Sequence, residues 1–229
     1  MKLVFDIGYN KGEFANVCFK EHPECTVVGV EANLSLIYNL PPKKGLTLIH
    51  ALVSSEKDQE KDFYIEPNQT GISTASTKFM ENSRFTKGSK NLRPQSANWM
   101  NPTKVRTTTL DEMVEKYGTP DMIKIDVEGY EYEVLQGLSA KQKKICFEWH
   151  EEEEDTLYKI VEHLQNLGYS QYGIIGYFDE GDVFETATYS DKGDPYLEEP
   201  ENYYSWEDLK VEALIKPERR VNYGMMFVK

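Results

Sequence analysis

Short apolar runs alternate with amphipathic stretches along the first two thirds of the chain, which predicts strands separated by helices. Six strands are expected in this part, at residues 3–6, 26–30, 46–53, 104–108, 122–127 and 145–149. Helices are expected at residues 12–20, 34–40, 110–117, 131–136 and 157–167. Because strands and helices alternate, the sequence predicts an α/β fold with a doubly wound, mostly parallel sheet.

The remaining segments break this alternation. Residues from about 67 to 103 are polar with weak periodicity, which predicts an inserted, lid-like loop. Residues 171–178, 183–188 and 224–228 predict a β-rich, antiparallel C-terminal part, interrupted by an acidic, tyrosine-rich segment at about 179–206. We therefore expect a single domain over residues 1–229.

Charge and composition disfavour some classes of function. The 229 residues carry 26 Lys and Arg against 39 Asp and Glu, a net charge of −13, which disfavours binding to nucleic acid. No apolar run approaches the roughly 18–20 residues of a membrane span. The first residues do not resemble a signal peptide, so we expect a cytoplasmic protein without a membrane partner.

A glycine-rich turn joins the first expected strand to the first helix, in the sequence Phe5-Asp-Ile-Gly-Tyr-Asn-Lys-Gly12. Asp6 ends the strand, where a carboxylate suits an ammonium group, and the following helix N-terminus suits a carboxylate. Glu31 ends the second strand, a position where acidic residues bind ribose hydroxyls. A nucleoside with an amino-acid arm fits both signals, and S-adenosylmethionine is such a molecule. The alternative is an ordinary strand–helix turn.

Four blocks of sequence resemble the FkbM-type methyltransferases, a branch of the class I S-adenosylmethionine-dependent enzymes. They are FDIGYNKGEF at 5–14, VGVEAN at 28–33, TTLDEMVEKYG at 108–118 and IKIDVEGYEYEVLQG at 123–137. The resemblance implies methylation of hydroxyl groups on sugars or secondary metabolites. It implies cofactor contacts at Asp6, Gly8, Tyr9, Asn10, Gly12, Phe14, Glu31, Ala32, Ala51, Leu52 and Asp126.

Methyl transfer to an alcohol benefits from a base that removes the hydroxyl proton. Our candidate catalytic residues are His150, Asp126 and Glu128, which lie at the C-terminal ends of two expected strands. Glu148, near the end of the strand that precedes His150, is a further candidate base. These carboxylates could instead hold a divalent cation, as in a metal-dependent small-molecule O-methyltransferase, although no ligand spacing is diagnostic and metal is not the favoured interpretation.

The expected acceptor is a small molecule or glycan. Candidate substrate contacts are Ser73, Ser76, Arg84 and Trp149. A local group of basic residues favours an anionic acceptor such as a sugar phosphate, and a solvated basic loop is the alternative. This group comprises Lys78, Arg84, Lys87, Lys90, Arg93, Lys104 and Arg106. Tyrosines at 189, 196, 203 and 204 are candidates for stacking on sugar rings or for packing.

Three other functions fit the sequence less well. An NAD(P)-dependent oxidoreductase would need a GxGxxG turn, which this sequence lacks. A nucleic-acid methyltransferase is disfavoured by the overall charge. A methyltransferase-like binding module that has lost catalysis is opposed by the intact Asp6, Gly8, Gly12 and Glu31.

Overall fold

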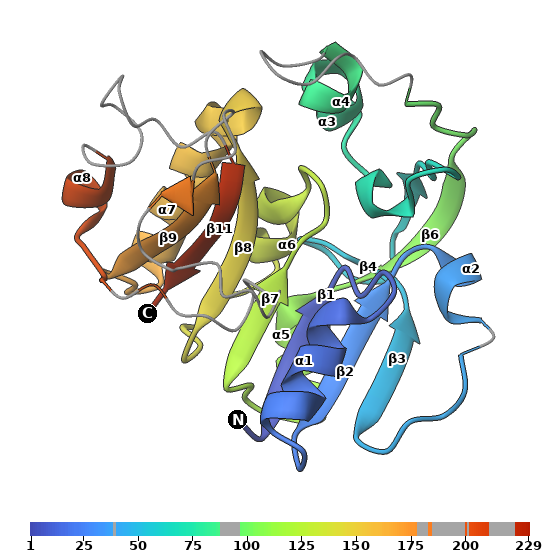
Figure 1. The fold of residues 1–229 in the computed structure, drawn as a ribbon, viewed down its shortest axis with the longest axis horizontal. Coiled ribbons are helices and arrows are strands. Elements are labelled where there is room, and N and C mark those ends of the chain that lie inside the picture. Colours follow the sequence, from blue (N-terminus) through green and yellow to red (C-terminus); the bar gives the residue numbers. More distant parts are fainter. Residues whose placement is uncertain (39, 88–96, 178–182, 185–199, 201, 211–222) are drawn as a thin grey trace.

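The computed structural model describes residues 1–38, 40–87, 97–177, 183–184, 200, 202–210 and 223–229. Its main element is an eight-stranded sheet with the order β10-β9-β11-β8-β7-β1-β2-β3 (Figure 1). The strands are β1 (Leu3–Ile7), β2 (Thr26–Glu31), β3 (Leu46–His50), β7 (Met122–Ile125), β8 (Ile145–His150), β9 (Tyr172–Tyr177), β10 (Val183–Phe184) and β11 (Tyr223–Val228).

Strand direction confirms the predicted fold class. Strands β3, β2, β1, β7 and β8 pair in parallel, whereas β11 pairs antiparallel with both β8 and β9, and β10 pairs antiparallel with β9. The strand order reverses between β1 and β7. In open α/β sheets this reversal creates a crevice at the carboxyl ends of the strands, where ligands bind.

Helices cover both faces of the sheet (Figure 1). They are α1 (Glu13–Glu21), α2 (Leu34–Ile37), α5 (Leu110–Tyr117), α6 (Glu131–Gln136), α7 (Glu154–Asn166) and α8 (Trp206–Leu209). In β1, Phe5 and Ile7 belong to one core cluster, which contains residues of α5, α6, α7 and α8. Val4 belongs to a second cluster, with Phe14 of α1. Burial on both faces explains the nearly continuous apolar character of these strands.

The expectation of one strand over residues 46–53 was wrong. The chain forms β3, leaves the main sheet at Ala51, and continues as β4 (Leu52–Val53) in a second, three-stranded sheet with the order β4-β6-β5. The amide of Ala51 donates to the carbonyl of Glu31, the last residue of β2, at 3.2 Å. This is the point at which the chain leaves β2. The predicted strand at 104–108 is β6 (Thr103–Thr108), which lies in the small sheet beside β5 (Glu60–Phe63). The polar β5 was not predicted.

The described part of the 67–103 segment contains short helices: the 3-10 helix η1 (Thr70–Ile72), α3 (Thr77–Asn82) and α4 (Arg84–Lys87). This segment contacts the main sheet beyond the end of β7, where Thr74 donates to the carbonyl of Glu128. None of the helices in the described part of the chain has the length and apolar character that a bilayer crossing requires.

Candidate functional site

A pocket opens at the carboxyl ends of β1, β2, β7 and β8, on both sides of the strand-order reversal. Nine of the residues that the resemblance implied as cofactor contacts line it: Gly8, Tyr9, Asn10, Phe14, Glu31, Ala32, Ala51, Leu52 and Asp126. Ser73 lines the pocket as well, from the segment after η1. The local signals at the strand ends therefore converge in space.

The turn after β1 requires its glycines. Gly8 has φ 80°, and a Cβ atom there would lie 1.8 Å from the carbonyl oxygen of Asp126, so the turn and the end of β7 are in backbone contact. Gly12 has φ 77°, and its Cβ would lie 2.2 Å from the Tyr9 hydroxyl. Glycine at both positions lets the backbone adopt a left-handed conformation and approach its neighbours closely.

Glu31 is held firmly at the pocket wall. Its two carboxylate oxygens accept the backbone N–H groups of Asn10 and Asn33, each at 2.7 Å, and the residue is 6% exposed. Burial raises the pKa of Glu31, although these amide hydrogen bonds oppose the change. A carboxylate accepts about four hydrogen bonds, so capacity remains for two ligand hydroxyls.

Asp6 and Gly12 do not line this pocket, although we expected both to contact the cofactor. Asp6 is fully buried, and its Oδ1 lies 3.4 Å from Nζ of Lys124, which also lies 3.4 Å from Oδ2 of Asp126. Lys124 donates to the carbonyl of Gly8 at 3.0 Å. Burial raises the pKa of Asp6 to about 6, although the positive charge of Lys124 lowers it. Asp6 thus has a buried ammonium partner within the protein.

Lys124 was not among the predicted site residues. It is 4% exposed, and although burial lowers its pKa, the charges of Asp126 and Asp6 raise the pKa above its ordinary value. A lysine inside the apolar strand β7 was a sequence signal for a buried ion pair, since a charge in such a strand needs a partner.

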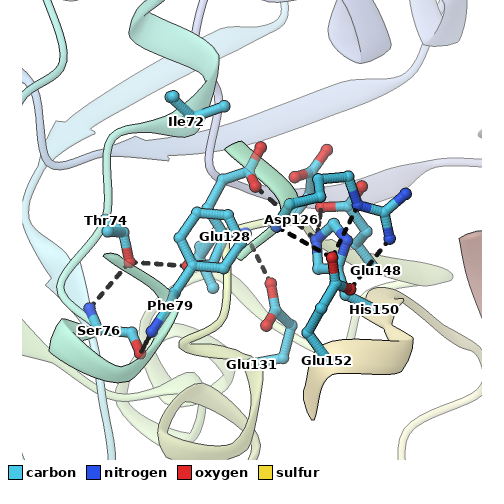
Figure 2. A network of polar contacts seen from close by, with 12 residues as sticks. Ile72, Thr74, Ser76, Phe79, Asp126, Glu128, Glu131, Glu148, His150 and Glu152 are labelled. Atoms are coloured by element: carbon cyan, nitrogen blue, oxygen red, sulfur yellow. Dashed lines mark hydrogen bonds and ion pairs between the residues drawn. The ribbon is translucent and has the colours of Figure 1, made fainter. Parts of the chain in front are cut away.

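Carboxylates gather at the ends of β7 and β8 (Figure 2). Asp126, Glu128 and Glu148 all line the pocket. Glu128 has φ 56°, which is uncommon for a residue with a side chain, and Thr74 donates to its carbonyl oxygen at 2.7 Å. Burial, followed by the charges of Glu148 and Asp126, raises the pKa of Glu128 well above its ordinary value.

His150 completes this cluster from the last position of β8. Its Nε2 lies 3.3 Å from Oε2 of Glu148 and 3.8 Å from Oε2 of Glu128. The ring is 6% exposed, with Phe79 and Tyr223 on its sides at centroid distances of 5.6 and 6.4 Å. Burial lowers the pKa of His150, but the Glu148 carboxylate outweighs it and raises the pKa overall. Burial raises the pKa of Glu148, and the nearby His150 opposes this rise.

The remaining substrate candidates lie apart from the pocket. Arg84 is buried in a two-pronged ion pair with Glu152, Ser76 caps α3 by accepting the Phe79 amide at 3.0 Å, and Trp149 packs in the core. All three side chains are therefore engaged within the protein, outside the pocket lining. Tyr203 and Tyr204 also pack against the core clusters, whereas residues 189 and 196, and the basic residues 90 and 93, lie outside the described residues.

The fold and this pocket define a class I methyltransferase architecture. The family model of the methyltransferase FkbM domain matches residues 6–170, and the chain therefore belongs to the FkbM methyltransferase family. This membership confirms the resemblance to the FkbM-type methyltransferases that the four sequence blocks indicated. Among curated proteins, none matches.

Several solved structures are similar at low identity. The methyltransferase FkbM from Methylobacillus flagellatus KT is 14% identical, with a TM-score of 0.48 over 80% of this chain and 42% of that one. Precorrin-6y C5,15-methyltransferase from Geobacter metallireducens GS-15 is 12% identical (TM-score 0.42; 99% and 80% covered). A SAM-dependent methyltransferase from Archaeoglobus fulgidus is 13% identical (TM-score 0.38; 99% and 84%). The chain thus spans less than half the length of the first of these.

Proposed function

We propose that this protein is an S-adenosylmethionine-dependent O-methyltransferase that acts on a hydroxyl group of a sugar, glycan or related small molecule. The observation that carries the proposal is the convergence of two sites in one pocket. A wall around Glu31 that suits a nucleoside shares this pocket with a group of carboxylates at the ends of β7 and β8.

The residues present fit the cofactor. Glu31 has hydrogen-bonding capacity for the two ribose hydroxyls, and Ala32, Ala51 and Leu52 offer an apolar surface for adenine. The glycine turn and the N-terminus of α1 lie beside them, where backbone N–H groups favour the carboxylate of the methionine arm. When bound, S-adenosylmethionine supplies an electrophilic methyl group on a sulfonium ion.

The carboxylate cluster serves the acceptor. An alcohol is a weak nucleophile, so its oxygen attacks more readily when its proton passes to a nearby base. Asp126, Glu128 and Glu148 offer such oxygens at the pocket, and Lys124 fixes Asp126 in place. Closure by the 70–87 segment, through Thr70 to Asn10 and Thr74 to Glu128, helps to orient the acceptor and exclude water.

Calorimetric titration with S-adenosylhomocysteine, on the wild type and on Glu31→Gln, tests cofactor binding. We expect micromolar binding that weakens at least tenfold in the variant, about 1.4 kcal/mol, because a neutral amide is a poorer acceptor for ribose hydroxyls. Glu66→Gln is the matched control, since Glu66 is buried but lies outside the pocket lining. Folded wild type that fails to bind would contradict the proposal.

A screen of hydroxyl acceptors, with sugars first, tests the reaction. Production of S-adenosylhomocysteine should depend on an acceptor and should fall in Glu148→Gln. Cofactor binding without transfer to any hydroxyl acceptor would instead favour the binding-module alternative.

A further inference from the structure

Three potential ligand atoms converge beside the pocket without hydrogen-bond partners. They are Oε2 of Glu128, Oε2 of Glu148 and Nε2 of His150, each buried and each without a hydrogen bond within the described part of the chain. One ligand atom from each of the three residues lies within 4.8 Å of the other two. Buried polar atoms in folded proteins normally have partners, so three adjacent exceptions point to a missing ligand.

From this arrangement we propose that Glu128, Glu148 and His150 form a binding site for a divalent transition-metal ion. His150 is the observation that distinguishes the site from an ordinary acidic cluster. Its ring is 6% exposed, and Phe79 and Tyr223 on its sides direct Nε2 toward the two carboxylates.

The spacing suits one ion. Ligand atoms bound at about 2.1 Å to a tetrahedral or octahedral metal are separated by about 3.0–3.5 Å. Nε2 of His150 lies 3.3 Å from Glu148 and 3.8 Å from Glu128, so a small side-chain movement would bring all three to coordination distance. Two carboxylates with one imidazole favour Mn²⁺, Fe²⁺ or Zn²⁺ over Mg²⁺ and Ca²⁺, which prefer ligand sets made only of oxygen.

The electrostatics also favour a cation. Asp126, Glu128 and Glu148 crowd around the site, and Lys124 is already engaged by Asp6, Asp126 and the Gly8 carbonyl. Arg84 is another nearby cation, and Glu152 pairs with it. A divalent ion would offset the mutual repulsion of Glu128 and Glu148.

The location assigns the ion a role that rests on the proposed function. Glu128 and Glu148 line the cofactor pocket, so open coordination positions would face the acceptor. A hydroxyl bound there becomes more acidic. Its oxygen then forms the bond to the methyl carbon as the sulfur–carbon bond breaks, and its proton passes to Asp126, which lies outside the ligand set.

Titration of Mn²⁺ alone into chelator-treated full-length protein, followed by electron paramagnetic resonance, tests the site without cofactor or acceptor. We expect one Mn²⁺ per chain. Glu148→Gln and His150→Phe should each weaken binding at least tenfold, because each removes one ligand while keeping the side-chain shape. Thermal unfolding without metal would reveal whether either variant folds poorly. In that case Glu128→Gln provides a third, independent test, and it should also weaken Mn²⁺ binding.

Glu131→Gln is the matched control. Glu131 is a buried neighbouring carboxylate outside the ligand set, and it accepts the Val127 amide at 3.0 Å. Its Mn²⁺ affinity should stay within threefold of the wild type. Folded wild type that takes up no Mn²⁺, or equal uptake by the wild type and the three ligand variants, would overturn the site. Binding of S-adenosylhomocysteine by that same preparation would show that only the metal proposal had failed.

Discussion

Arg84 and Glu152 join the segment after η1 to the 3-10 helix η2 (Glu151–Glu153), which follows β8. Nε and Nη2 of Arg84 donate to the two carboxylate oxygens of Glu152, at 3.1 Å each, and the Arg84 amide donates to the same carboxylate at 3.0 Å. The guanidinium also lies over the ring of Tyr223, 4.2 Å from its centroid. This cation thus fastens α4 to the segment that follows β8 and to β11.

Replacing Arg84 by Met should therefore destabilise the fold. The loss of buried, charge-assisted hydrogen bonds is expected to cost about 1.5–3 kcal/mol, which lowers Tm by about 2–4 °C per kcal/mol in a chain of this size. Arg106→Met is the matched control, because Arg106 pairs with Asp58 on the surface. Thermal unfolding checks the comparison, and equal losses of Tm in the two variants would contradict it.

Gly8→Ala should disrupt the pocket as well as the fold. The added methyl group would collide with the Asp126 carbonyl, and the positive φ adds strain of about 1–3 kcal/mol. Gly71→Ala is the control, since Gly71 lines the same pocket but its nearest neighbour would be 3.8 Å from a Cβ atom. Chemical denaturation should show a clear loss for Gly8→Ala and little change for Gly71→Ala; a neutral Gly8→Ala would mean that the turn can shift away from β7.

Lys124→Met alone should lower the free energy of unfolding more than the double change of Lys124→Met with Asp6→Asn. The single change leaves a fully buried carboxyl group without its cation, which is expected to cost about 3–5 kcal/mol. The second change removes that unpaired charge, so the double variant should recover part of the loss in urea unfolding. Simple additivity of the two changes would argue against direct coupling.

Asp6→Asn by itself separates a structural role from cofactor binding. Because Asp6 is fully buried and does not line the pocket, we expect calorimetry to show affinity for S-adenosylhomocysteine within threefold of the wild type. A loss of tenfold or more would instead support the original expectation of a contact with the cofactor ammonium group.

Stability should fall as pH rises through neutrality, and Glu131 is one cause. Burial, with the nearby charge of Glu148, raises the pKa of Glu131 to about 8 in the folded protein, above the ordinary value of an unfolded chain. The folded state therefore holds this proton more tightly, so its stabilising contribution is complete below about pH 4.5 and is lost as pH rises toward 8. The slope reaches at most about 1.4 kcal/mol per pH unit.

Glu131→Gln removes this proton while keeping an oxygen for the Val127 amide. Denaturation curves between pH 5 and 9 should be flatter for the variant, with its advantage over the wild type growing at high pH. Parallel curves for the two proteins would show that Glu131 titrates alike in the folded and unfolded states.

The sequence by itself determined the fold class, the order of most elements and the residues at the strand ends. These signals are local: apolar periodicity defines strands and helices, and Gly8 and Gly12 mark a turn that only glycine permits. Glu31 and Asp126 follow strands of a parallel sheet, whose carboxyl ends meet at one edge. Their presence at one pocket therefore followed from the alternation of elements.

Tertiary structure decided which residues become partners. Residues 46–53 read as one strand, yet β4 pairs with β6, a segment far along the chain. Asp6 pairs with Lys124, and Arg84 with Glu152, across similarly long separations. A buried charged side chain needs a partner within the protein, because water cannot reach it. The sequence near that side chain does not show which distant residue the partner will be. The meeting of Glu128, Glu148 and His150 likewise needed the left-handed turn after β7 to face the end of β8.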